Sequence, residues 1–211
     1  MKASHNSMSY LSPVTWWGKI LRPWSQCQNV DIAEQFRMGV RYFDIRIAPE
    51  YRDGKYYAHY CHGVTDYGPV EYSRFKYLCE WLDNHASGPV YIRICLDVRR
   101  KPKDAKAMKR WFLAWVDKLK AQQWYWLKVD SIKVFWEPFS VDYGPHEIAV
   151  TEKHWSVTNR PWYEYIMPLR WYARRHNAQF INEFNEYLQK PFPQKVDSTS
   201  EALMIDFWNV Q

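Results

Sequence analysis

The sequence VRYFDIRI at Val40–Ile47 decides the fold, because apolar and polar side chains alternate along it. Successive side chains of an extended strand point to opposite faces. The two faces then carry different residues: Phe43, Ile45 and Ile47 on one, and Tyr42, Asp44 and Arg46 on the other. A carboxylate and a guanidinium are costly to bury unless each is paired. We therefore expect the charged face of this strand to belong to a functional site.

Two later segments repeat the alternation, VYIRICLD at Val90–Asp97 and LMIDFW at Leu203–Trp208. Strands of this kind suit a closed or nearly closed sheet, with helices over the apolar face and charged side chains in the centre. The chain has 211 residues, whereas about 250 are typical of such a barrel. We predict an α/β fold: a single-domain distorted TIM-type (β/α) barrel over residues 1–211, with some helices short or missing.

The charge, the cysteines and the apolar runs of the chain indicate which partners and which cellular compartment to expect. The formal net charge of +6 favours an anionic partner, which leaves a phosphate ester, an anionic membrane or nucleic acid open. The four cysteines show no paired spacing, so we expect free thiols. The start MKASHNSM lacks an apolar signal segment, and no run of about 18 apolar residues occurs elsewhere. We expect a cytoplasmic protein.

Turn and capping signals place the other elements. A short strand at 1–4 would deliver His5 and Asn6 into a turn, and Asn29 or Asp31 would cap a helix that ends at Gly39. Apolar periodicity and breakers predict the remaining elements: helices over 69–84, 102–122 and 160–188, the last interrupted at 168, and strands over 131–136 and 146–155.

The segment 10–24 is rich in tryptophan and includes Trp16 and Trp17 together with Lys19 and Arg22. Packing against the core is one interpretation, since aromatic side chains dominate burial. The other is a membrane-facing rim, because tryptophan beside basic residues suits the lipid headgroup region. The sequence alone leaves both open.

Five dispersed residues could together cleave a phosphodiester without a metal. Two histidines, His5 and His62, can divide base and acid work near pH 7. An arginine such as Arg46 suits a phosphate that gains negative charge in the transition state. Asp44 and Asp206 could fix a histidine tautomer or hold the guanidinium. His59 and His62 lie three positions apart, on opposite faces of a strand, so they do not favour a metal site.

Five runs resemble the catalytic X domain of phosphatidylinositol-specific phospholipase C, in particular its bacterial, metal-independent branch. They are SHNSM at 4–8, WSQCQNVDIAEQFRMGVRYFDIRI at 24–47, YYAHYCHG at 56–63, GPVYIRICLD at 88–97 and ALMIDFW at 202–208. The resemblance covers the first hundred residues and the last strand, whereas 101–200 match by the order of elements only.

The resemblance implies a role for each matched residue. His5 would be the general base that takes the proton from the inositol 2-hydroxyl. His62 would be the general acid that protonates the departing diacylglycerol oxygen. Arg46 would replace the calcium ion of the eukaryotic branch, so no cofactor is expected. Asp44 would organise the site beside the arginine, and Asp206 would orient His5.

The resemblance is weaker for the residues that would bind substrate. Asn6 stands where the bacterial enzymes carry an aspartate that backs the general acid. We expect substrate contacts from four residues: Asn6, Arg93, Lys153 and Trp155.

The leading hypothesis is cleavage of a phosphoinositide lipid into diacylglycerol and a cyclic inositol phosphate. The same chemistry on a soluble phosphodiester is an alternative. A third is a catalytically silent module that uses its basic, tryptophan-rich surface to bind membrane or nucleic acid, although such a module needs neither catalytic histidine. We expect a monomer with peripheral membrane contact and without a nucleic-acid partner.

Overall fold

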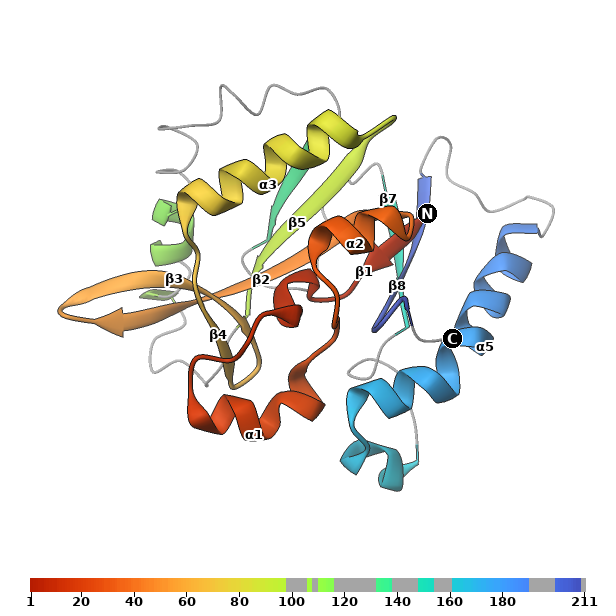
Figure 1. The fold of residues 1–211 in the computed structure, drawn as a ribbon, viewed down its shortest axis with the longest axis horizontal. Helices are drawn as coiled ribbons and strands as arrows, with labels where there is room; N and C mark the ends of the chain where they lie inside the picture. Colours follow the sequence, from red (N-terminus) through yellow and green to blue (C-terminus); the bar gives the residue numbers. More distant parts are fainter. Residues whose placement is uncertain are drawn as a thin grey trace.

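The computed structural model describes residues 1–97, 106–107, 110–115, 132–137, 148–153, 161–189 and 200–209. Figure 1 shows a central twisted sheet with helices packed around it. Among the described helices, none is both long and apolar enough to cross a lipid bilayer.

Six parallel strands form the body of the sheet, in the order β6-β5-β2-β1-β8-β7. Their bounds are Ile132–Glu137 for β6, Val90–Leu96 for β5, Val40–Arg52 for β2, Lys2–Ser4 for β1, Ser200–Ile205 for β8 and Ile148–Glu152 for β7. Parallel strands joined through helices are the elements of a (β/α) barrel. Within the described residues, no pairing joins β6 to β7.

A β-hairpin extends one side of the sheet. β3 (Lys55–His62) pairs antiparallel with the last residues of β2, and β4 (Thr65–Pro69) pairs antiparallel with β3. The turn between β2 and β3 contains Asp53 and Gly54, both with positive φ, which suits a two-residue hairpin turn. His62, a predicted site residue, is the last residue of β3.

The alternation predicted for the strands is observed. Phe43, Ile45 and Ile47 belong to the main apolar core, which lies between the sheet and the helices. Tyr42 belongs to a smaller cluster on the opposite face, together with four other side chains: Ala3, Tyr91, Ala202 and Met204. The opposite faces of one strand therefore pack into two separate cores.

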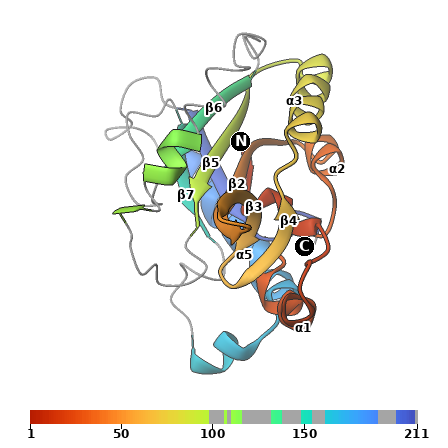
Figure 2. The same ribbon diagram turned by 90° about the vertical axis from the view of Figure 1, so that its left-hand side faces the viewer.

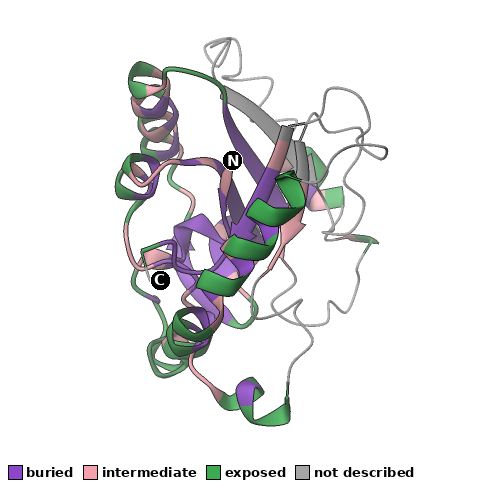
Figure 3. Cartoon of the chain, turned by 90° about the vertical axis from the view of Figure 1, so that its right-hand side faces the viewer, coloured by how far each residue is buried: buried purple, intermediate pink, exposed green. Residues whose placement is uncertain are grey.

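Helices cover the outer face. α2 (Ile32–Arg37) is capped by Asp31, whose carboxylate accepts a hydrogen bond from the amide of Glu34, and α3 (Tyr72–His85) follows the hairpin. Figure 2 shows these two helices on the same side of the sheet. A 3₁₀ turn, η3 (Trp162–Ile166), leads into α5 (Leu169–Gln189), which lies beside β8. Figure 3 shows the buried strands between helices whose outer turns are exposed.

Three expectations need correction or restriction. The last strand ends at Ile205, before Phe207 adopts a left-handed φ of 51°. The tryptophan-rich segment forms helix α1 (Trp16–Ser25), but Trp16 and Trp17 are 60% and 59% exposed and do not pack into the core. Of the helix expected over 102–122, only 106–107 and 110–115 lie within the described residues, and these are helical.

Candidate active site

The predicted site residues gather around the carboxyl ends of the parallel strands β1 and β8. His5 follows β1, Asp206 follows β8, Asp44 and Arg46 belong to β2, and His62 ends β3. In (β/α) barrels the carboxyl ends of the strands carry the functional groups. The register explains the convergence, because Ser4 pairs with both Phe43 of β2 and Ile205 of β8.

His5 is held by a carboxylate. Its Nδ1 atom lies 2.7 Å from Oδ1 of Asp206, and the two side chains are 1% and 2% exposed. The side chain of Asn177 on α5 fixes the backbone here, since its amide donates to the carbonyl oxygens of Asp206 and Phe207. With Asp206 on Nδ1, the nitrogen of His5 that can exchange a proton with a substrate is Nε2.

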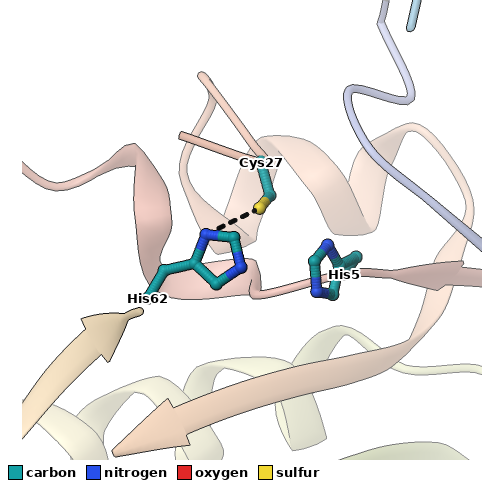
Figure 4. A group of neighbouring side chains, drawn as sticks. All are labelled: His5, Cys27 and His62. Atoms are coloured by element: carbon teal, nitrogen blue, oxygen red, sulfur yellow. Dashed lines mark hydrogen bonds between the residues drawn. The ribbon is translucent and has the colours of Figure 1, made fainter. Parts of the chain in front are cut away.

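His62 lies edge-on to His5. The ring centroids are 5.2 Å apart with an interplanar angle of 85°. The Nδ1 of His62 donates to the carbonyl oxygen of Ser25 at 2.9 Å, and it also lies 3.5 Å from the Sγ of Cys27 (Figure 4). Burial, and then the positive charge of Arg46, lower the pKa of His62. The ring is therefore mainly neutral at pH 7 before substrate binds.

A buried ion-pair network joins β2 to β5. Asp44 accepts from the Nε of Arg46 at 2.9 Å and from the Nε of Arg93 at 2.8 Å. Burial alone would raise the pKa of Asp44, but Arg46 and Arg93 hold it well below its usual range. Arg93 is fully buried and also donates to Glu152 on β7 at 3.2 Å. The network fixes the Arg46 side chain, which is 14% exposed.

Asn6 connects the turn after β1 to strands β2 and β3. Its amide N–H donates to Asp44 at 3.1 Å, and its side-chain Nδ2 donates to the carbonyl oxygen of Cys61 at 2.9 Å. The backbone is left-handed, with φ 40° and ψ 63°, a conformation that asparagine tolerates better than most residues. Asn6 thus holds the backbone beside His62, next to Cys61 on β3.

The residues of the site differ in their exposure. His5, Asp44 and Asp206 are buried, whereas Arg46 and His62 are partly exposed. A cavity of about 640 Å³ lies elsewhere, on the outer face of the sheet between α3 and the hairpin, where Tyr60 and Trp81 line it. A substrate phosphate would therefore approach from the side of Arg46 and His62.

Lys153 and Trp155 are the other two residues that the sequence predicts to contact substrate. The ammonium of Lys153 is 3.3 Å from Glu183 on α5 and 5.8 Å from the ring of Phe180. Trp155 lies outside the described residues. Substrate contacts from Lys153 and Trp155 stay predictions.

Sequence reasoning missed two neighbours of the histidines, Ser25 and Cys27. They lie at and just after the end of α1, within the WSQCQN run that carries the family resemblance. The thiol of Cys27 is buried beside both histidines, and one ligand atom from each of His5, Cys27 and His62 lies within 4.8 Å of those from the other two. All four cysteines are free, as predicted.

Known proteins were compared with the chain at the levels of sequence and structure. No protein-family model and no curated protein sequence matches it. Among solved structures, phosphatidylinositol-specific phospholipase C from Listeria monocytogenes matches with a TM-score of 0.60 and 16% identity, over 98% of this chain and 87% of that one. The chain shares the fold of that protein, and the similarity confirms the predicted α/β, TIM-like architecture.

Proposed function

We propose that the protein cleaves a phosphodiester by metal-independent general acid–base catalysis, with phosphatidylinositol-type lipids as substrates. The observation that carries the proposal is the pair of imidazoles, His5 backed by Asp206 and His62 edge-on at 5.2 Å, beside the Arg46 guanidinium. Two imidazoles in different environments suit opposite proton-transfer roles. The phospholipase C fold supports the same reaction class.

The reaction needs no group beyond these side chains and the substrate. His5 takes the proton of the hydroxyl adjacent to the phosphate through Nε2, and the hydroxyl oxygen forms a bond to phosphorus. The bond from phosphorus to the leaving oxygen breaks, and His62 gives its proton to that oxygen. The products are an alcohol, diacylglycerol for a lipid substrate, and a cyclic phosphate. The His5 proton returns to solvent when the site resets.

Arg46 stabilises the charge that develops on phosphorus-bound oxygens. A guanidinium can donate two hydrogen bonds to a phosphate. Asp44 occupies its Nε, which leaves the two terminal nitrogens for the substrate. Burial opposes the charge of Arg46, but Asp44 raises its pKa, so the group stays cationic throughout turnover.

His62 must be protonated to act as an acid, although burial and Arg46 favour its neutral form. An anionic phosphate between the two side chains offsets the charge of Arg46 and favours the imidazolium. Substrate binding therefore prepares His62 for its role. Asp44, whose charge is engaged by two guanidiniums, remains a carboxylate.

An exposed apolar surface adjoins the site and favours a lipid substrate. The exposed side of α1 carries five large apolar side chains: Trp16, Trp17, Ile20, Leu21 and Trp24. The indole of Trp24 donates to the carbonyl oxygen of Ile166 at 2.8 Å, which joins this surface to η3, where Trp162 and Ile166 are exposed. Ser25, the last residue of α1, holds His62. A bilayer against α1 would place a headgroup next to the acid.

Phosphorus NMR on a panel of phosphodiesters tests the proposal. The wild-type protein, incubated with excess chelator and phosphatidylinositol, is expected to release a cyclic phosphate. His5→Ala and His62→Ala should each lower the rate by about 10²- to 10⁴-fold, the usual contribution of a general acid or base. His85→Ala, an exposed histidine at the end of α3, is the matched control.

Three outcomes separate the hypotheses. Cleavage of soluble diesters but not of lipid would support the proposed reaction and show that its substrate is a soluble phosphodiester. Wild-type rates in both active-site variants would exclude the assigned roles. Absence of cleavage across the panel, together with vesicle binding, would favour the silent module.

A further inference from the structure

The Cys27 thiol lies against both proposed catalytic imidazoles and has no part in the proposed reaction. It is fully buried, and its Sγ lies 3.5 Å from the Nδ1 of His62. Burial, and then the nearby Asp206 carboxylate, raise the pKa of Cys27 well above its usual range, so the thiol is neutral and a poor nucleophile. A different chemistry must explain any role for this side chain.

Two nitrogens and a sulfur are the donor set of a zinc site. Zinc in proteins takes cysteine sulfur at about 2.3 Å and histidine nitrogen at about 2.0–2.1 Å, which puts tetrahedral ligand atoms about 3.3–3.6 Å apart. One ligand atom from each of His5, Cys27 and His62 already lies within 4.8 Å of those from the others. Three protein ligands leave the fourth position open.

The surroundings of the cluster match those of ligating histidines. A metal-bound histidine usually donates its second N–H to a carboxylate or a carbonyl oxygen, which fixes the ring. Asp206 takes this place at the Nδ1 of His5, 2.7 Å away. Ser25 takes it at the Nδ1 of His62, 2.9 Å away, and the second nitrogen of His62 lies on the side of the ring that faces His5 (Figure 4).

Charges of both signs surround the cluster: the Asp206 carboxylate lies at His5, and Asp44 is paired with Arg46 and Arg93. A thiolate formed on binding would add a further negative charge. Soft sulfur with imidazole selects zinc-like ions and disfavours calcium and magnesium, which prefer oxygen ligands.

We propose that His5, Cys27 and His62 bind Zn²⁺, and that the bound ion switches off phosphodiester cleavage by occupying both imidazoles. The switch rests on the proposed function, whereas the zinc site does not. On binding, the S–H bond of Cys27 breaks, the proton leaves to solvent, and the thiolate ligates the metal. Neither imidazole can then exchange a proton with substrate.

Metal titration of the chelator-treated, full-length protein tests the site without reference to activity. Calorimetry should show Zn²⁺ binding at one site and no comparable binding of Ca²⁺ or Mg²⁺. Co²⁺ should give a sulfur-to-cobalt charge-transfer band. Cys27→Ser should weaken zinc binding by about 100-fold or more, since losing even a partner that only orients a ligand costs 10- to 100-fold. Cys79→Ser, which changes a buried thiol on α3, should bind as wild type does.

Turnover tests the switch. Saturating Zn²⁺ should lower the cleavage rate by at least about 10²-fold, the contribution of one general acid or base, and chelator should restore it. Cys27→Ser should resist zinc, so that its rate in saturating Zn²⁺ equals its own rate in chelator. Equal zinc affinity in the wild type and Cys27→Ser would overturn the site. Cysteine-dependent binding that leaves turnover unchanged would overturn the switch.

The zinc site can be tested even if one of the experiments above fails. If Cys27→Ser does not fold, the wild-type cobalt complex decides: a sulfur-to-cobalt charge-transfer band would support the site, and its absence would overturn the site. If the wild type cleaves no phosphodiester, the proposed function fails, while calorimetry and the cobalt spectrum still test zinc binding.

Discussion

The Nδ1 of His5 lies 2.7 Å from the Oδ1 of Asp206, although 201 positions separate the two residues in the sequence. Parallel pairing of β1 with β8 creates this contact, because Ser4 pairs with Ile205 and each charged side chain follows its strand directly. Asp206 is thereby held beside His5, where it sets the tautomer of the proposed base.

Asp206→Asn is expected to lower kcat by about 10³- to 10⁴-fold, because an amide can hold the imidazole in the wrong tautomer and cannot stabilise the imidazolium. Asp206 is a positioning residue, so KM should change much less than kcat. Steady-state kinetics with the chelated enzyme measure both constants.

Asp66→Asn is the matched control for that substitution, since Asp66 holds His59 at 2.9 Å in a second Asp–His pair on the hairpin. Its kcat should stay near that of wild type. A similar loss in both variants, or a change in KM alone for Asp206→Asn, would contradict the positioning role.

Arg46→Ala is expected to lower kcat by about 10²- to 10³-fold, the usual cost of removing one group that stabilises transition-state charge. Wild-type activity should be insensitive to excess chelator, because Arg46 supplies the positive charge. Rates with chelator and with added Ca²⁺ give the measurement, and Arg37→Ala, at an exposed pair on α2, is the control. A requirement for Ca²⁺ in the wild type would refute the role of Arg46.

Arg93→Met is expected to lower the free energy of unfolding by about 3 kcal/mol, because it leaves the buried charge of Asp44 and the partly buried charge of Glu152 with fewer partners. The estimate takes the lower end of the range for broken buried pairs, since Arg46 still contacts Asp44. Urea denaturation measures the change. Arg37→Met should cost no more than about 1 kcal/mol, and an equal cost for the two variants would contradict a structural role for Arg93.

The stability of the protein in acid should depend on Asp44. Its folded pKa lies well below the ordinary value of 3.8, so its contribution is complete above pH 3.8 and is lost as the pH falls through the folded pKa. Asp44→Asn removes this contribution and should make stability fall less steeply below pH 3.8 than in wild type. Urea midpoints measured across the acid range give the two slopes, with Glu34→Gln, on the exposed face of α2, as the control. Equal slopes for wild type and Asp44→Asn would be inconsistent with the network.

Much of the sheet is predictable from the sequence because side-chain alternation is a local property. The apolar face of Val40–Ile47 packs into the main core as the pattern predicts, whereas Tyr42 on the other face joins a second, smaller core that the pattern does not predict. The ends of strands are less predictable. The alternation continues through Trp208, but the backbone turns at Phe207, whose amide donates to the carbonyl oxygen of Cys27. Contacts with a distant segment end this strand, and the strand's own residues carry no sign of them.

The candidate site is predictable only in part. Family motifs carry His5, Arg46 and His62, which the fold brings together at the ends of neighbouring strands. Cys27 escapes prediction, since it reaches the site from the segment after α1 and has no ligand spacing in the sequence. For Lys153 the sequence predicts a substrate contact but not its ion pair, because the partner Glu183 lies on α5, far away in the sequence.

The tryptophans of α1 give the last prediction. Trp16 and Trp17 stack on each other with centroids 3.6 Å apart, and more than half of each side chain is exposed. Burial of a large apolar side chain stabilises binding by about 1.5–3 kcal/mol, and about 1.4 kcal/mol corresponds to a tenfold change in affinity. Changing both to alanine should therefore weaken binding to phosphatidylinositol vesicles by at least about 10-fold.

Vesicle sedimentation measures this binding, and cleavage of a short, soluble phosphodiester in parallel should proceed at the wild-type rate, because neither indole touches the imidazoles. Tyr77→Ala, which removes an exposed aromatic side chain from α3 on another face, should bind vesicles as wild type does. Unchanged vesicle binding in the double variant would place the membrane contact elsewhere. An equal loss of soluble turnover would show instead that α1 supports His62 through Ser25 and that its tryptophans help to hold that arrangement.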